Sequence, residues 1–404
     1  MNMTHWLLGN CYHYLPELLA QSFWLPAAGS KSASNYHFVF NLILYVTSFF
    51  FLLVVGLMLL FVIKYRRRVV GGGKQEKAAT HNTPLEITWT GIPLIIVIVF
   101  FFLGFKGFMD LDQPPSDAVA IDVTGSKWAF VFTYPNGAQS KDLYLPLNKP
   151  VVLNMTATDV LHSLYIPAFS VQKNLIPQQT TQMWFQATSL TTDDHPYTLF
   201  CTQYCGQGHS QMGSGNPDIT KASFCYVKTE SDWKAKLEEL GNIFVNPNTK
   251  KPLPLRAVGE KLYRNIGCAS CHSADGSDGQ GPTYKGLYKC DVEYYTSDGQ
   301  PGILRKTDSD KLWDDYLRES VVYAGRKIVK GRQNVMPPYE SQFAGSAVKE
   351  RKLEAIIEYI KSLGPDYKPL PDPASATTAP AAGKKSGAQS DDPFVPRTAA
   401  PPSK

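Results

Sequence analysis

The sequence has almost no excess of charge of either sign, and it has few cysteines. Forty Lys and Arg residues stand against 35 Asp and Glu residues, which leaves a net charge of +5 over 404 residues. That excess is too small to indicate a nucleic-acid partner. The seven cysteines are an odd number, which argues against a closed disulfide framework. The first 35 residues lack a basic start, an apolar core and a small-residue cleavage site, so no signal peptide is indicated.

The cysteines are unevenly spaced. Four of them form two tight pairs, at positions 201/205 and 268/271, a spacing typical of metal and cofactor sites. The remaining three stand alone and are interpreted as buried or unpaired thiols: Cys11, Cys225 and Cys290. Cys11 follows an asparagine in LLGNC, which is a poor lipoprotein signal, so we expect it to be unmodified.

Long apolar runs are confined to the part of the chain before residue 110. Phe38–Ile63 contains no charged residue, and as a helix it would rise roughly 39 Å, enough to cross a bilayer with some tilt. Ile87–Phe105 is a second uncharged run, and a membrane helix tolerates its Pro93. The alternative of core helices in a soluble protein fits the first run poorly because of its length, and fits the second run better.

The loop between the two runs predicts their orientation. Lys64–Lys77 carries six basic residues and one glutamate. Short basic loops stay in the cytoplasm, so both ends of the chain, and everything after residue 110, are expected outside. Glu86 begins the second run, where a carboxylate either lies at the membrane interface or faces protein or water.

Residues 115 to 230 change to a period of two. Apolar and polar residues alternate from Ala118 to Gly137, and five further short runs of β-type follow, separated by Pro, Asn, Asp and Gly clusters. Such a series, with no helical pattern between the strands, predicts an antiparallel sandwich or barrel. The segment CTQYCGQGHSQM follows one of these strands and is therefore predicted to form a loop at one end of the domain.

This loop, Cys201–Met212, combines two thiols, an imidazole and a thioether. Sulfur donors of this kind favour copper over hard cations, while a structural zinc site rarely uses methionine. A disulfide between Cys201 and Cys205 would leave His209 and Met212 without a purpose. If the fold brings His162 to the same end of the domain, two thiolates could bridge two metal ions with one imidazole on each.

At these residues the chain resembles subunit II of haem–copper cytochrome c oxidase, a family with a two-helix membrane hairpin and a cupredoxin-like β-barrel. In that family Cys-x3-Cys-x3-His-x2-Met and an upstream histidine hold a binuclear mixed-valence copper centre, CuA. The resemblance implies that Cys201 and Cys205 supply two bridging thiolates and that His162 and His209 supply two imidazoles. It also implies two weak ligands, the thioether of Met212 and the backbone carbonyl of Gln203.

The resemblance extends to three further positions. HNTPLEITWTGIP is similar to the start of the family's second helix, which implies that Glu86 lies at the mouth of a proton channel into subunit I. GSKWAFVFTYPNG is similar to its aromatic strand, which implies that Trp128 lies where an electron donor docks, although a core aromatic explains Trp128 equally well. The family usually has glutamate at position 203 as a magnesium contact, so Gln203 weakens or removes that contact.

The C-terminal third begins with a second cofactor motif. Cys268-Ala269-Ser270-Cys271-His272 is Cys-x-x-Cys-His, the attachment motif for c-type haem. The rival redox dithiol would need a thioredoxin-like βαβ pattern, which this sequence lacks. His272 would bind the iron from one face, and Met336 is the candidate for the other, since no other His or Met follows His272.

The surroundings of this motif resemble a class I cytochrome c domain. Helical patterns are expected at about Ala257–Ile266, from Ser309 as N-cap, and from Val348 to a stop at Gly364. In that class a proline carbonyl, here that of Pro282, accepts the ring N–H of the haem histidine and orients it. Residues 369–404 are rich in Pro, Ala, Ser and Lys, and we expect them to be disordered.

We therefore predict a multidomain membrane protein with five parts: an extracytoplasmic segment (1–35), a transmembrane hairpin (36–110), an all-β cupredoxin CuA domain (111–245), an all-α cytochrome c domain (246–368) and a tail (369–404). Haem and copper on one side of a bacterial inner membrane, the periplasmic side, form an electron relay. Cytochrome c or a membrane-bound donor would reduce the haem, and oxygen would be reduced in subunit I, because two helices cannot supply the histidines for that chemistry. Other oxidase subunits are expected partners.

Three rival functions remain. A copper-bearing small subunit of a nitric oxide reductase would have a similar sequence. A quinol oxidase subunit of the same fold would lack the copper ligands. A copper-delivery protein would need neither Met212 nor a fused haem domain.

Overall fold

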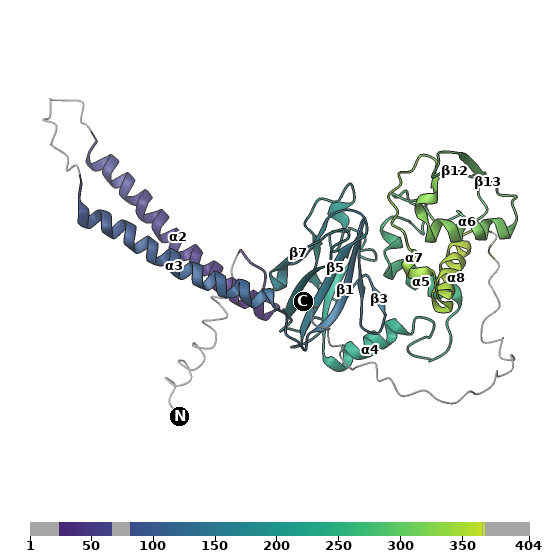
Figure 1. The fold of residues 1–404 in the computed structure, drawn as a ribbon, viewed down its shortest axis with the longest axis horizontal. Coiled ribbons are helices and arrows are strands. Elements are labelled where there is room, and N and C mark those ends of the chain that lie inside the picture. The colour runs from purple at the N-terminus through teal and green to yellow at the C-terminus, as the bar shows by residue number, and fades with distance from the viewer. Residues whose placement is uncertain (1–23, 67–80, 366, 368–404) are drawn as a thin grey trace, which may run out of the picture.

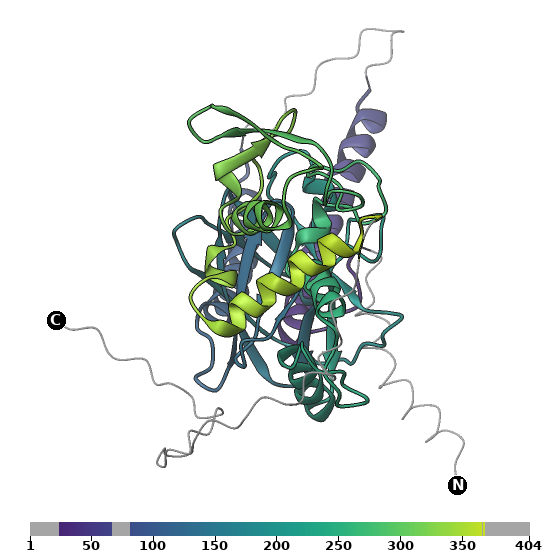
Figure 2. The same cartoon turned by 90° about the vertical axis from the view of Figure 1, so that its right-hand side faces the viewer.

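In the computed structural model the chain forms a helical hairpin, a β-domain and a helical C-terminal domain, arranged in that order (Figure 1). The structure describes residues 24–66, 81–365 and 367. Cys11, most of the basic loop Lys64–Lys77 and the tail 369–404 lie outside the described residues. Figure 2, viewed from the side of the C-terminal domain, shows the helix α8 (Ala347–Ser362) in front of the strands of the β-domain.

The hairpin consists of α2 (Lys31–Lys64) and α3 (Thr83–Asp112), which pack on each other. At 34 and 30 residues, both are long enough to span a bilayer, and the most apolar stretch of each has no buried residue. Pro93 lies within α3 without ending it. The helices begin before the two predicted apolar runs, because polar residues cap their N-termini. The Ser30 hydroxyl accepts a hydrogen bond from Ala33 N, and the Asn82 side-chain oxygen accepts one from Leu85 N.

The outer end of α2 is attached to the β-domain. The Ser30 hydroxyl donates to the carbonyl of Phe169, and Gly29 N donates to the carbonyl of Ala168. His37, about two turns further along α2, is buried at this junction. The hairpin is therefore a continuation of the β-domain and not a separate appendage.

The β-domain is built from short strands in three sheets. One sheet has the order β3-β2-β1-β5-β8, and the others have the orders β10-β6-β7 and β4-β11-β9. The strands are β1 (Val119–Ser126), β2 (Ala129–Thr133), β3 (Gln139–Ser140), β4 (Leu143–Pro146), β5 (Pro150–Ala157), β6 (His162–Ile166), β7 (Val171–Leu175), β8 (Thr181–Gln186), β9 (Tyr197–Thr198), β10 (Phe200–Cys201) and β11 (Phe224–Lys228).

The expectation of a purely antiparallel domain is wrong in two places. β1 pairs parallel with β5, and β11 pairs parallel with β4. Alternation of apolar residues identifies which face of a strand is buried, but it carries no information on strand direction. The alternation itself places the core well: apolar residues of β1, β2 and β5, such as Ile121, Phe132 and Leu153, are fully buried between the sheets.

The helix α4 (Glu230–Gly241) leads from β11 toward the C-terminal domain, with Thr229 as its N-cap. That domain contains α5 (Leu255–Asn265), α6 (Asp310–Val322), α7 (Glu340–Phe343) and α8 (Ala347–Ser362). The predicted N-cap Ser309 accepts from Leu312 N. α5 packs on α8, which buries the predicted face of Leu353, Ile356, Ile357 and Ile360.

The C-terminal domain also contains a small sheet that the prediction of an all-α domain omitted. Its order is β13-β12-β14, formed by β12 (Val292–Thr296), β13 (Pro301–Leu304) and β14 (Lys327–Val329). The signal was present: VEYYT is rich in β-branched and aromatic residues, and the following Ser-Asp-Gly is a turn sequence. The domain is otherwise helical, as expected.

Candidate metal and haem sites

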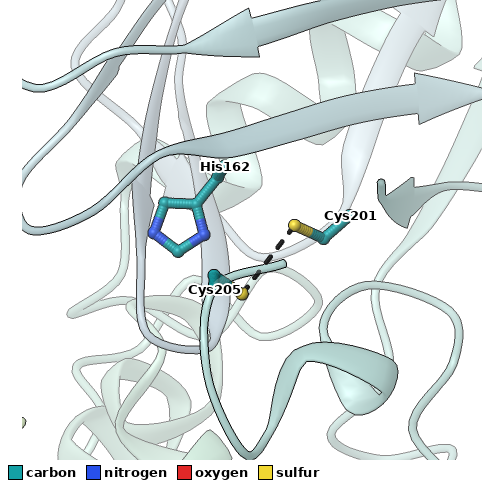
Figure 3. A group of neighbouring side chains, drawn as sticks. All are labelled: His162, Cys201 and Cys205. Atoms are coloured by element: carbon teal, nitrogen blue, oxygen red, sulfur yellow. Dashed lines mark hydrogen bonds between the residues drawn. The ribbon is translucent and has the colours of Figure 1, made fainter. Parts of the chain in front are cut away.

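The first candidate site lies where β6 begins and β10 ends. These strands pair antiparallel, with Cys201 opposite Leu164, two residues from His162. Donor atoms of His162, Cys201 and Cys205 all lie within 4.8 Å of one another, and all three residues are buried (Figure 3). The pairing of these strands is therefore what brings the distant histidine to the loop, and the three side chains could hold a metal.

The remaining candidate ligands surround the two thiols. The Sγ atoms of Cys201 and Cys205 are 3.9 Å apart. His209 Nδ1 lies 3.5 Å and Met212 Sδ 3.9 Å from Cys205 Sγ. The carbonyl oxygen of Gln203 lies 3.3 Å from Cys201 Sγ, while the Gln203 side chain is exposed. The structure thus brings all six predicted positions to one place.

Hydrogen bonding prepares His162 as a ligand. Its Nε2 lies 2.8 Å from Oδ1 of Asp159, while its Nδ1 is buried with no hydrogen-bond partner among the described residues. A metal-bound histidine characteristically uses one nitrogen for the metal and donates the other N–H to a carboxylate. Burial lowers the pKa of His162, but the neighbouring Asp159 carboxylate and Cys201 sulfur outweigh this effect, and the net shift of the pKa is upward.

The two thiols are electrostatically unequal. The hydrogen bond between the two sulfurs lowers the pKa of Cys201 and raises the pKa of Cys205. A thiolate is therefore available in the buried cluster, as a soft metal ligand requires. The buried nitrogen without a partner and the sulfur-rich donor set fit a copper site better than a zinc site.

Trp128 lies directly against the copper-type loop. Its Nε1 donates to the carbonyl of Cys205 at 3.2 Å, and its side chain is only 6% exposed. A Cβ on Gly208 would lie 2.5 Å from Trp128 Cδ2, so only glycine permits this contact. The two predicted roles of Trp128 are therefore not exclusive: it is a core residue that also touches the site.

The second candidate site is a cavity in the C-terminal domain. Its walls include Cys271, His272, Pro282 and Met336. His272 Nδ1 lies 2.8 Å from the carbonyl oxygen of Pro282, which leaves Nε2 for a metal. Tyr284 stacks on the His272 ring at 4.6 Å between centroids. The chemistry of these residues fits a haem, which Cys271, His272 and Met336 would hold.

The cysteines of this site do not have the character of a redox dithiol. Burial raises the pKa of Cys268 to about 12 and that of Cys271 to about 11. A reactive dithiol needs at least one thiol with a lowered pKa. Both groups are therefore suited to structural or covalent roles.

Glu86 lies in the first turn of α3, far from both sites in the chain. Its Oε1 accepts from Asn82 N at 3.1 Å, while Asn82 caps the same helix. This reciprocal arrangement is similar to a capping box, with the glutamate one position later, and it explains the residue locally.

One residue of the first site was missed by the sequence reasoning. Asp159 binds His162, and its spacing of three residues before the histidine was the available signal. A carboxylate at that distance in a loop before a strand can reach the ring, but many can, and only the fold identifies this one.

Three family models match the chain. They are cytochrome c oxidase subunit II, transmembrane domain, at residues 19–106; cytochrome c oxidase subunit II, periplasmic domain, at residues 136–215; and cytochrome c at residues 257–364. These matches support a membrane protein with a periplasmic domain of the CuA type and a domain of the haem c type.

Several proteins similar to this chain are named cytochrome c oxidase subunit 2. Cytochrome c oxidase subunit 2 of Alkalihalophilus pseudofirmus is 27% identical over 70% of this chain and 74% of its own length. That of Bacillus sp. PS3 is 24% identical over 69% of this chain and 74% of its own length. That of Cereibacter sphaeroides is 27% identical over 33% of this chain and 56% of its own length.

Among solved structures, the periplasmic domain of subunit II of cytochrome oxidase from Bradyrhizobium japonicum overlaps 32% of this chain and 96% of its own length, at 20% identity and a TM-score of 0.28. From the three family matches and the named relatives together, the chain belongs to the cytochrome c oxidase subunit II family, as an electron-transfer subunit of a haem–copper oxidase with a fused cytochrome c domain.

Proposed function

We propose that this chain carries electrons from a haem in its C-terminal domain to a CuA centre in its β-domain, and from there to a partner subunit that reduces oxygen. The observation that carries the proposal is the contact between the two sites. Cys271 Sγ lies 3.8 Å from the carbonyl oxygen of Lys127, and the next residue, Trp128, donates to Cys205. A haem-attachment residue and a copper-loop residue are thus joined through two consecutive residues.

In the β-domain, the proposed copper ligands follow from the distances. Cys201 and Cys205 would bridge as thiolates, and His162 and His209 would each donate through Nδ1. Met212 and the Gln203 carbonyl would complete the set as weak donors. His162, Cys201, Cys205 and Met212 are buried, and Trp128 packs against the loop, so packing holds these donors in place.

In the C-terminal domain, Cys268 and Cys271 would attach the porphyrin, while His272 and Met336 would be the axial ligands. The Pro282 carbonyl fixes the ring of His272, and Gly281 lies against the same ring, where a Cβ would come within 2.5 Å of Cε1. Bound copper and haem would each supply a one-electron carrier at these places.

The partners of the chain follow from its membrane hairpin and its site. The proposed complex contains subunit I, which supplies the oxygen chemistry, and other oxidase subunits in a bacterial inner membrane, with both redox domains periplasmic. A cytochrome c or a membrane-bound donor would reduce the haem. Glu86 would serve at a proton channel, and the neutral Gln203 side chain gives no charged contact to a magnesium ion.

The experiment is performed on the purified holo-chain and on its complex. Rapid reduction of the haem by a photoreductant should be followed by oxidation of the haem in step with loss of a near-infrared copper band. A chain with two coppers that never accepts electrons from the haem would contradict the relay. Oxygen consumption by the complex, without nitric oxide reduction, separates the oxidase from the nitric oxide reductase alternative.

A further inference from the structure

Asp159 contacts two different parts of the interface between the redox domains. Its Oδ1 lies 2.8 Å from His162 Nε2 and accepts from Val160 N at 2.7 Å. Its Oδ2 accepts from the backbone N–H of Lys127 at 2.8 Å. One carboxylate therefore ties the loop before β6, which carries a proposed copper ligand, to the turn between β1 and β2.

The turn held by Asp159 is the surface on which the haem-type domain rests. The Lys127 carbonyl is 3.8 Å from Cys271 Sγ, and Trp128 donates to Cys205. The next residue, Ala129, lies so close to the start of the haem motif that a Cβ on Gly267 would be 2.9 Å from Ala129 Cβ. Below, residues 127–129 are called the strap.

The surroundings of Asp159 reach the far side of the haem-type site as well. Lys127, Asp159, Met336 and Pro337 line one crevice. The Asp159 side chain is 19% exposed toward this space, while His162 is fully buried. The carboxylate thus stands between the proposed copper imidazole and the loop that carries the proposed haem methionine.

The following inference rests on the proposed relay. We propose that Asp159 is a positioning residue that fixes both the His162 ring and the strap. This one carboxylate thereby sets the copper-site geometry and the docking of the haem domain. An aspartate is suited to this because each of its two oxygens accepts a charge-assisted hydrogen bond. An asparagine offers one carbonyl oxygen, and its amide donates where the carboxylate accepted.

The test replaces Asp159 with asparagine in the holo-chain. The copper near-infrared band and hyperfine pattern should shift, because the His162 ring loses its orienting carboxylate. Amide hydrogen exchange at residues 127–129 should accelerate about tenfold, the size expected for losing one charge-assisted hydrogen bond. Haem-to-copper transfer should slow by at least a similar factor, with copper and haem contents unchanged.

The matched control is Asp122→Asn, since Asp122 is an exposed carboxylate on β1 of the same domain and also accepts a side-chain hydrogen bond, from Asn154. It should change none of the three readouts. A shifted copper signature in Asp159→Asn without faster exchange at the strap or slower transfer would overturn the proposal and leave the relay intact. A wild-type chain without any haem-to-copper transfer would instead refute the relay.

A second variant keeps the proposal testable if Asp159→Asn folds poorly. Ala129→Phe enlarges the strap where it meets Gly267 and touches neither Asp159 nor a proposed ligand. It should slow haem-to-copper transfer while the copper signature stays as in wild type. Unchanged transfer in this variant would show that the strap is not the docking surface, and the proposal would fall.

Discussion

The two redox regions of this chain differ in how far the polypeptide alone builds each site. In the β-domain, donors from two strands and one loop meet within a few ångströms, and one histidine nitrogen is buried without a partner among the described residues. In the C-terminal domain, His272 and Met336 line one cavity. A small ion needs donor atoms that converge on one point, and the strands of a sheet can fix such donors. A haem needs a cavity, which the haem itself fills as part of the domain core.

This difference predicts that the copper-type site is the more sensitive to a single ligand change. Cys205→Ser should abolish the paired copper centre, because a serine hydroxyl cannot replace a bridging thiolate, while the haem spectrum stays unchanged. Cys290→Ser removes a half-buried thiol that only donates to Leu287 and should affect neither centre. Electron paramagnetic resonance and haem absorption are the measurements, and an intact mixed-valence signal in Cys205→Ser would contradict the ligand assignment.

Replacing Met336 should remove one ligand of the haem and leave the haem attached to the chain. Met336→Ala should remove the weak absorption band of a methionine-ligated ferric haem, since Cys268, Cys271 and His272 still hold the group. Met183→Ala, which truncates a buried methionine of the β-domain, should leave this band in place, although it costs that domain about 2–5 kcal/mol. Retention of the band in Met336→Ala would mean that another residue is the sixth ligand.

A smaller effect should come from the packing between Trp128 and the copper-type loop. Gly208→Ala forces its new methyl against the indole, and overpacking of this kind costs about 1–3 kcal/mol. Thermal unfolding of the β-domain should report that loss. In the double variant, Trp128→Leu should relieve part of this loss of stability. Additive stability losses of the two changes in the double-mutant cycle would contradict the contact between the two residues.

The smallest effect on both redox regions should come from the hairpin. Glu86→Gln keeps an acceptor for Asn82 N, so α3 and both metal spectra should be unchanged. Proton uptake by the assembled complex should slow if Glu86 lies at a channel mouth. Turnover equal to that of the wild type would leave only the capping role.

Much of this architecture was predictable because its signals are local. The two apolar runs, the alternation of the β-strands, the Ser309 cap and Cys-x-x-Cys-His each need only a short window of sequence. The clustering of His162 with the thiols was expected from a family resemblance, because no spacing rule places a residue 39 positions before Cys201 beside it.

What sequence could not supply depends on long-range pairing. The parallel β1–β5 pairing and the role of Asp159 follow from which loops share one end of a sheet. The contact of Cys271 with the strap requires two domains to meet, and no pattern within either domain encodes it. The β12–β13 hairpin is different: its β-branched and aromatic residues and its turn were visible in the sequence, and the helical pattern around it obscured them.

The most direct test of the account is the copper content and electron paramagnetic resonance spectrum of the holo-chain. The account predicts two coppers per chain and a hyperfine pattern from one electron shared between two copper nuclei, with a haem c on the same polypeptide. One copper per chain with the spectrum of an isolated ion, or zinc in its place, would contradict it.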